Sequence, residues 1–210
     1  YAFANGVGGY EDFADYPLWL VAVANSPLQG SMFLAAIFAA VYRGGGLVRD
    51  FLLQTKRNDI FLGLSVGVAA QFFLVPVLTY PVLWLFDKDI EDVRKIAEEL
   101  TDRPSTPIGV IALIAFVGLF TPIAEELFFR GLLYGSLRKK LNLSPRYCVW
   151  VSAVIASAIF SIVHFQWILL PALFGVGLVF NILYEKTGRL TPAIWAHAAF
   201  NGVTLINLLV

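Results

Sequence analysis

The chain has 210 residues, of which 59% are hydrophobic and only 14% are charged, and its formal net charge is zero. Soluble domains usually contain about 45–50% apolar and about 25% charged residues, so the composition argues for a polytopic protein in a lipid bilayer. The neutral balance and the lack of a basic stripe exclude a nucleic-acid partner, and the single cysteine, Cys148, excludes an intramolecular disulfide.

Apolar runs bounded by charges predict six membrane-spanning helices, because about 20 apolar residues cross the hydrocarbon core. In chain order the runs are residues 16–41, 60–86, 108–137, 147–165, 167–184 and 190–210. Pro27 interrupts the first run, and Pro76 and Pro81 interrupt the second, so kinks are expected there. The predicted fold class is all-α: a polytopic transmembrane helical bundle of about six spans, forming one integral membrane domain over residues 1–210.

The loop charges predict the orientation of the bundle. The loops after the first, third and fifth spans are basic and would share the cytoplasmic side. Their basic residues are Arg43, Arg49, Lys56, Arg57, Arg138, Lys139, Lys140, Arg146, Lys186 and Arg189. The other side carries the acidic segment 1–15 and the loop 87–103, whose apolar residues recur at helical spacing. This loop is predicted to form an amphipathic helix at the interface or a solvated linker helix.

Three charged residues, Glu125, Glu126 and Arg130, interrupt the third apolar run. A charge inside a span costs about 2.5–3.5 kcal/mol on insertion scales, so these side chains need a compensating use. Glu126 and Arg130 are four residues apart and can pair on one helical face. Glu125 has no such partner and is a candidate general base, although the three residues could also form a packing cluster that links helices.

Both histidines of the chain lie in apolar runs, and we expect both on helices. Phe160 precedes His164 by four residues, and His197 precedes Asn201 by four. A lone histidine on an apolar helix is usually a satisfied core group, but two such pairs suggest a shared site. A Ser161–His164 pair is an alternative without motif support, and the chain has no His-Glu-x-x-His metal motif.

The chemistry that these groups suggest is hydrolysis. Glu125 could accept a proton from water while His164 orients the water. The N–H groups of His197 and Asn201 could stabilise a developing oxyanion, and each such donor is typically worth about 2.7–4 kcal/mol.

Together, the three motifs resemble those of the intramembrane proteases of the type II CAAX prenyl endopeptidase and bacteriocin-processing (CPBP, Abi) family. The motifs are Glu125-Glu126-x-x-x-Arg130, Phe160-x-x-x-His164 and His197-x-x-x-Asn201. The combination is specific, although each motif alone would be weak. The resemblance covers about residues 121–201, with segments 187–190 and 192–197 also similar to bacterial members.

The resemblance implies an all-helical membrane endopeptidase with a protease core at about residues 104–210. It implies these roles: water activation by Glu125 and His164, support by Glu126 and Arg130, and oxyanion binding by His197 and Asn201. We expect Phe129 and Phe160, which belong to the first two motifs, to line the substrate pocket.

The resemblance also bears on cofactors and partners. Two glutamates and two histidines could hold Zn²⁺ by ligand type, but Arg130 beside the carboxylates opposes a dication. We therefore expect no cofactor, with a zinc-dependent protease as the alternative. The expected partner is a membrane-embedded or lipidated peptide or protein, which a prenylated CAAX-type substrate would exemplify, in a bacterial cell membrane. A non-catalytic membrane immunity or transport protein is the competing class, because intramembrane carboxylates and histidines also serve proton relays.

One estimate of depth opposes a shared site. At about 1.5 Å per helical residue, His164 lies about 27 Å from Arg146, whereas His197 lies about 12 Å from Arg189. Helix tilt, a recessed turn at residues 186–189, or a broken helix near Pro171 would reconcile the two depths.

Overall fold

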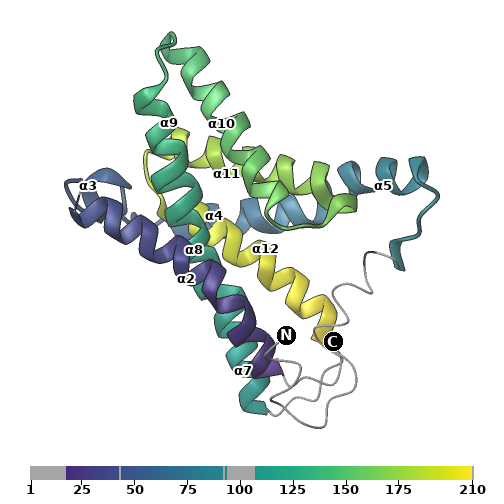
Figure 1. The fold of residues 1–210 in the computed structure, drawn as a ribbon. Helices are drawn as coiled ribbons and strands as arrows, with labels where there is room; N and C mark the ends of the chain where they lie inside the picture. Colours follow the sequence, from purple (N-terminus) through teal and green to yellow (C-terminus); the bar gives the residue numbers. More distant parts are fainter. Residues whose placement is uncertain (1–17, 43, 92, 94–106, 210) are drawn as a thin grey trace, which may run out of the picture.

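A computed structural model describes residues 18–42, 44–91, 93 and 107–209. Within these ranges every regular element is a helix, which confirms the all-α class (Figure 1). The α-helices are α2 (Leu18–Tyr42), α3 (Leu47–Asp50), α4 (Asp59–Ala69), α5 (Val75–Leu85), α7 (Pro107–Ala115), α8 (Thr121–Glu126), α9 (Gly135–Lys140), α10 (Pro145–Ile162), α11 (Leu170–Thr187) and α12 (Thr191–Leu209). Three π-helical turns, η2 (Ala70–Leu74), η3 (Phe116–Phe120) and η4 (Leu127–Tyr134), and the 3₁₀ turn η5 (Trp167–Leu169) join them.

Among the described residues, four continuous helices are long and apolar enough to cross a membrane, which supports the predicted helical membrane bundle. They are Asp59–Leu85, Pro107–Lys140, Pro145–Ile162 and Trp167–Thr187. Of the other two predicted spans, α2 contains a shorter apolar helix, Pro27–Tyr42, and α12 is not among the four. The total of six spans therefore stays a prediction. The predicted amphipathic helix at 87–103 and the acidic segment 1–15 lie largely or wholly outside the described residues.

Two of the spans contain π turns placed just before a proline. η2 ends two residues before Pro76, and η3 ends two residues before Pro122. Proline has no N–H group to donate to the preceding turn, and a π turn is one way a helix accommodates this loss. The predicted irregularity at Pro76 is thus a π turn, whereas α2 and α5 continue through Pro27 and Pro81.

The helix α4 packs closely against α12, and two glycines permit this approach. A methyl group added at Gly63 would lie 2.6 Å from the main-chain oxygen of Pro192, and one added at Gly67 would overlap the carbonyl of Ala196. It would also lie 2.9 Å from the Cβ atom of Ala199. Small residues four apart are a common means of close helix packing in membranes. This contact fixes the helix that carries His197.

The turn between α11 and α12 is recessed, which explains why the two histidines reach one depth. Arg189 in this turn donates to both carboxylate oxygens of Asp59 at the start of α4, at 2.7 and 2.8 Å. Leu190 is fully buried, and its N–H donates to the Leu52 carbonyl at 3.1 Å. The hairpin of α9 and α10 instead projects well beyond this turn (Figure 1). The path from the basic end to the site is therefore longer along α10 than along α12.

Candidate active site

The centre of the site is the carboxylate of Glu125, which lies between two imidazole rings. Its Oε2 atom is 3.9 Å from Nε2 of His164 and 3.8 Å from Nε2 of His197. These distances are too long for direct hydrogen bonds, and this buried oxygen has no other partner among the described residues. The structure thus brings together a carboxylate from α8, a histidine beyond the end of α10 and a histidine on α12.

Glu126 forms a fully buried pair with Arg130, as their four-residue spacing predicted. Its Oε1 atom accepts hydrogen bonds from Nη1 of Arg130 at 2.7 Å and from Nδ1 of His197 at 2.8 Å. A carboxylate can only accept, so Nδ1 of His197 carries the proton in this contact. The other ring nitrogen, Nε2, consequently faces Glu125. Glu126 therefore orients His197 as well as neutralising Arg130.

Arg130 is held between two aromatic rings. Its Cζ atom lies 4.7 Å from the ring centroid of Phe160 and 5.2 Å from that of Phe180. Nη2 also donates to the Gly177 carbonyl at 3.2 Å. A desolvated cation over an aromatic face can gain roughly 2 kcal/mol, so the rings offset part of the cost of burying this charge. Sequence reasoning missed Phe180 because nothing in the sequence distinguishes it among 18 phenylalanines.

His164 does not lie on a helix, so that expectation was wrong. α10 ends at Ile162, and His164 lies in the turn 163–165. Phe165, with φ of +55°, follows in the left-handed conformation that commonly terminates a helix. Nδ1 of His164 donates to the Phe160 carbonyl at 2.6 Å, and the two rings are in contact with centroids 4.7 Å apart. This bond leaves Nε2 directed toward Glu125.

The Ser161–His164 alternative finds no support in the geometry. The hydroxyl of Ser161 donates to the Ala158 carbonyl at 2.9 Å, and in the part of the chain that the structure describes no hydrogen bond joins that hydroxyl to the His164 imidazole. Ser157, which lies close by in sequence, accepts from Asn181 at 3.0 Å instead. Both hydroxyls therefore have structural partners.

The arrangement of the candidate ligands bears on the zinc alternative. Across residues 18–42, 44–91, 93 and 107–209, no three His, Cys, Asp or Glu side chains are arranged to hold one. Glu126 Oε1 is already shared by Arg130 and His197, and the guanidinium places a fixed positive charge beside the carboxylates. A dication that took Glu126 Oε1 as a ligand would have to displace these bonds.

Asn201 is positioned by a carbonyl that the η3 turn leaves without its helical partner. The amide of Thr121 donates to the Phe116 carbonyl, and the next residue, Pro122, has no N–H. The Val117 carbonyl therefore accepts from Nδ2 of Asn201 at 2.9 Å. An amide nitrogen has two hydrogens, so the second N–H of Asn201 remains for another acceptor. The predicted oxyanion donor is thus held on the wall of the site.

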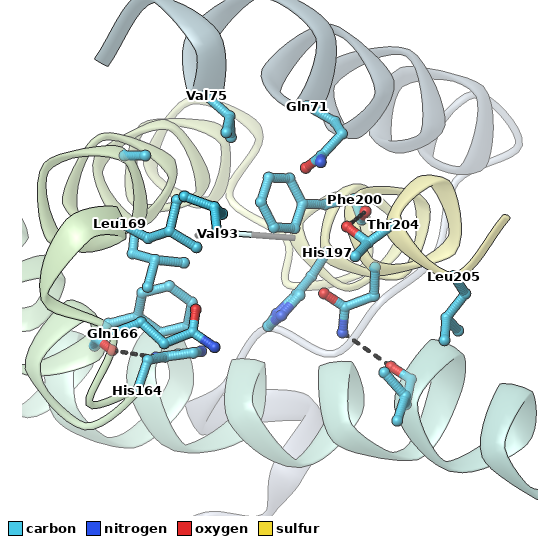
Figure 2. Close-up of a pocket in the computed structure, with 15 residues that line it drawn as sticks. Gln71, Val75, Val93, His164, Gln166, Leu169, His197, Phe200, Thr204 and Leu205 are labelled. Carbon is cyan, nitrogen blue, oxygen red and sulfur yellow. Dashed lines mark hydrogen bonds between the residues drawn. The ribbon is translucent and has the colours of Figure 1, made fainter. Parts of the chain in front are cut away.

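A cavity of about 390 Å³ adjoins these groups (Figure 2). Its polar lining residues are Gln71, His164, Gln166, His197, Asn201 and Thr204, and its apolar ones are Val75, Val93, Val117, Phe160, Leu169, Ala172, Leu173, Phe200 and Leu205. Of the two residues predicted for the substrate pocket, Phe160 lines this cavity. Phe129 does not line it: it is buried behind Phe160, with the ring centroids 5.1 Å apart.

The fold and the site together define a class: a helical integral membrane protein with two buried glutamates, a buried arginine, two histidines and an asparagine beside a largely apolar cavity. Residues 107–203 match the family described as type II CAAX prenyl endopeptidase Rce1-like. The match contains all three motifs, and it confirms the resemblance over that segment.

Bacterial relatives extend this comparison. The chain is 30% identical over 93 residues to the membrane-embedded CAAX protease MroQ of Staphylococcus aureus, covering 44% of this chain and 38% of MroQ. It is 26% identical over 162 residues to the candidate membrane peptidase YdiL of Bacillus subtilis, covering 76% and 64%. It is 27% identical over 180 residues to the uncharacterized protein YpbD of the same species, covering 81% and 82%. No solved structure matches the chain.

Proposed function

We propose that this protein is an intramembrane endopeptidase that hydrolyses a peptide bond in a membrane-associated protein or peptide of a bacterial cell membrane. The observation that carries the proposal is the unpaired Glu125 Oε2, 3.8 and 3.9 Å from the Nε2 atoms of His197 and His164. A polar gap of this size suits a bridging water. The family description and the name of MroQ support a substrate of the prenylated CAAX type.

In the proposed reaction, Glu125 is the general base. A water bound between Glu125 Oε2 and Nε2 of His164 gives a proton to Glu125, and its oxygen attacks the scissile carbonyl carbon. His164 can accept a hydrogen bond from this water because its Nδ1 proton is committed to the Phe160 carbonyl. The carbon–nitrogen bond then breaks, and Glu125 passes the proton to the leaving amine. A positioned proton-transfer group of this kind contributes typically about 10²–10⁴-fold.

The oxyanion formed by the attack would be stabilised from α12. The free N–H of Asn201 supplies one donor, and Nε2–H of protonated His197 supplies the second. Charge balance supports the protonated form: two carboxylates and one guanidinium leave the cluster with one excess negative charge, which an imidazolium neutralises. Buried charges are tolerated when they are paired and hydrogen-bonded.

We further propose that the reaction needs no metal, because the buried Arg130 guanidinium already places a fixed positive charge beside the carboxylates and pairs with Glu126. The test is cleavage in the presence of a chelator. Retained activity is expected, and loss of activity that Zn²⁺ restores would reject this part of the proposal.

The decisive experiment uses purified protein in liposomes and a farnesylated peptide ending in a CAAX sequence, beside its unprenylated counterpart. Wild type should release a product detectable by mass spectrometry, and Glu125→Gln should reduce the rate by about 10³-fold without loss of folding. Glu185→Gln is the matched control, because Glu185 lies outside the site and bonds to Tyr134 and Arg138.

If neither peptide is cleaved, peptidomics of cells that carry wild type or Glu125→Gln should reveal a substrate that accumulates with the variant. Full activity of Glu125→Gln would reject the base assignment. The absence of any product in both experiments would favour a non-catalytic membrane protein.

A further inference from the structure

Gln71 is a half-buried residue whose side-chain amide neither the motifs nor the proposed mechanism uses. It lies in η2, and it is the only Asn or Gln in the span Asp59–Leu85. Its Oε1 atom is buried and has no hydrogen-bond partner among the residues that the structure describes. A buried amide without a partner is unfavourable, and more so in a hydrocarbon environment. The position therefore needs a compensating contact.

The side chain of Gln71 lines the same cavity as the two histidines. In Figure 2, Gln71 and His164 lie at opposite ends of the cavity, with His197 between them. The remaining lining is largely apolar, so an amide at this place is available to whatever molecule enters. Gln71 and the catalytic groups would then contact the same ligand.

The main chain at Gln71 offers a second acceptor. The amide of Val75 donates to the Ala70 carbonyl, and the following residue, Pro76, has no N–H to reach the Gln71 carbonyl. This is the arrangement that frees the Val117 carbonyl in η3, where the freed oxygen is seen to accept from a side-chain amide. The η2 turn before Pro76 thus repeats the pattern of the η3 turn before Pro122, and both turns contribute a residue, Gln71 or Val117, to the lining of one cavity.

We propose that Gln71 binds a main-chain amide group of the substrate next to the bond that is cleaved, an inference that rests on the proposed function. Its Oε1 atom accepts the substrate N–H, and its Nε2 atom donates to the carbonyl of the same peptide group. A peptide that enters an apolar cavity loses its bonds to water, so each of its N–H and C=O groups needs a partner. The catalytic groups serve only the scissile carbonyl, and Gln71 serves the neighbouring peptide group.

The test measures peptide binding while both the protein and the peptide are varied. It uses the inactive Glu125→Gln protein, so that the result does not depend on cleavage. The probe is a fluorescein-labelled farnesylated CAAX peptide, and a series of variants carries one N-methyl group on each peptide bond in turn. N-methylation at one position should weaken binding about tenfold by removing a hydrogen bond, and Gln71→Met should weaken binding of the unmethylated peptide by a similar factor. In the Gln71→Met protein, methylation at that position should then have no further effect.

Gln29→Met is the matched control, because Gln29 also has a buried, unpaired Oε1 but does not line the cavity. This variant should keep the methylation pattern of the parent. Thermal unfolding of each variant checks that the substitution leaves the fold intact, and Gln71→Asn provides a second, shortened amide that should bind weakly. Three outcomes would overturn the inference. Gln71→Met could bind the unmethylated peptide as tightly as the parent does, or the parent could fail to bind any peptide. N-methylation could also weaken binding to Gln71→Met by the same factor as binding to the parent. Failure of cleavage alone would reject the proposed function and leave the binding result standing.

Discussion

Replacing Glu126 with glutamine tests whether the buried ion pair fixes the structure of the site. The carboxylate accepts from Arg130 and His197, and both it and Arg130 have no exposed side-chain surface. Removing one partner of a buried pair typically destabilises a protein by about 3–5 kcal/mol, because the other charge stays buried without compensation. Glu126→Gln keeps the shape and removes the charge. We therefore expect a loss of stability of about that size, measured by unfolding in mixed detergent and SDS micelles.

The double variant Glu126→Gln/Arg130→Met separates the ion pair from other effects of substitution. If the pair is responsible, the double variant should lose less stability than the sum of the two single variants. Glu185→Gln at the partly exposed Arg138–Glu185 pair is the control and should cost about 0–1 kcal/mol. Strictly additive losses for Glu126 and Arg130, or equal losses at Glu126 and Glu185, would refute the reasoning.

Three further outcomes follow from the packing and the hydrogen bonds. Gly67→Val should disrupt the α4–α12 contact, because even a methyl group overlaps the Ala196 carbonyl, and both cleavage and the thermal midpoint should fall. Asn201→Ala should lower kcat by about 10²–10³-fold at nearly unchanged KM, as expected for a lost oxyanion donor; an effect confined to KM would contradict that role. Asp59→Asn should lower the thermal midpoint by weakening the bidentate pair with Arg189, and it should leave kcat in the folded fraction unchanged.

The sequence was sufficient to predict that the two glutamates, Arg130 and the two histidines lie together, because charges and imidazoles are rare in apolar helices and need partners there. The spacing of Glu126 and Arg130 predicted their pair directly, since residues four apart share a helical face. The sequence was not sufficient to predict the position of His164. Four-residue spacing from Phe160 indicated a helix, but the chain leaves the helix at Ile162 while keeping the two rings in contact.

The supporting residues could not be predicted because their roles depend on contacts between helices. Phe180 and Phe129 are both apolar residues on apolar segments, yet one flanks the guanidinium and the other is buried behind Phe160. Gln71 was not predicted as a site residue, although the sequence contains a signal for it. An isolated amide within an apolar run that contains a proline five residues later is visible in the sequence, but its direction depends on the π turn.

The charged residues of the site differ in how much they contribute to holding the helices together. Arg130 reaches α11 through the Gly177 carbonyl, and Glu126 reaches α12 through His197, so these two residues join the helices that carry the site. Among the described residues, Oε2 of Glu125 accepts no hydrogen bond, so this atom does not join the helices in that way. Substitutions at Glu126 or Arg130 should therefore impair stability and activity together. Substitution at Glu125 should remove activity alone, which makes it the position where chemistry can be tested apart from folding.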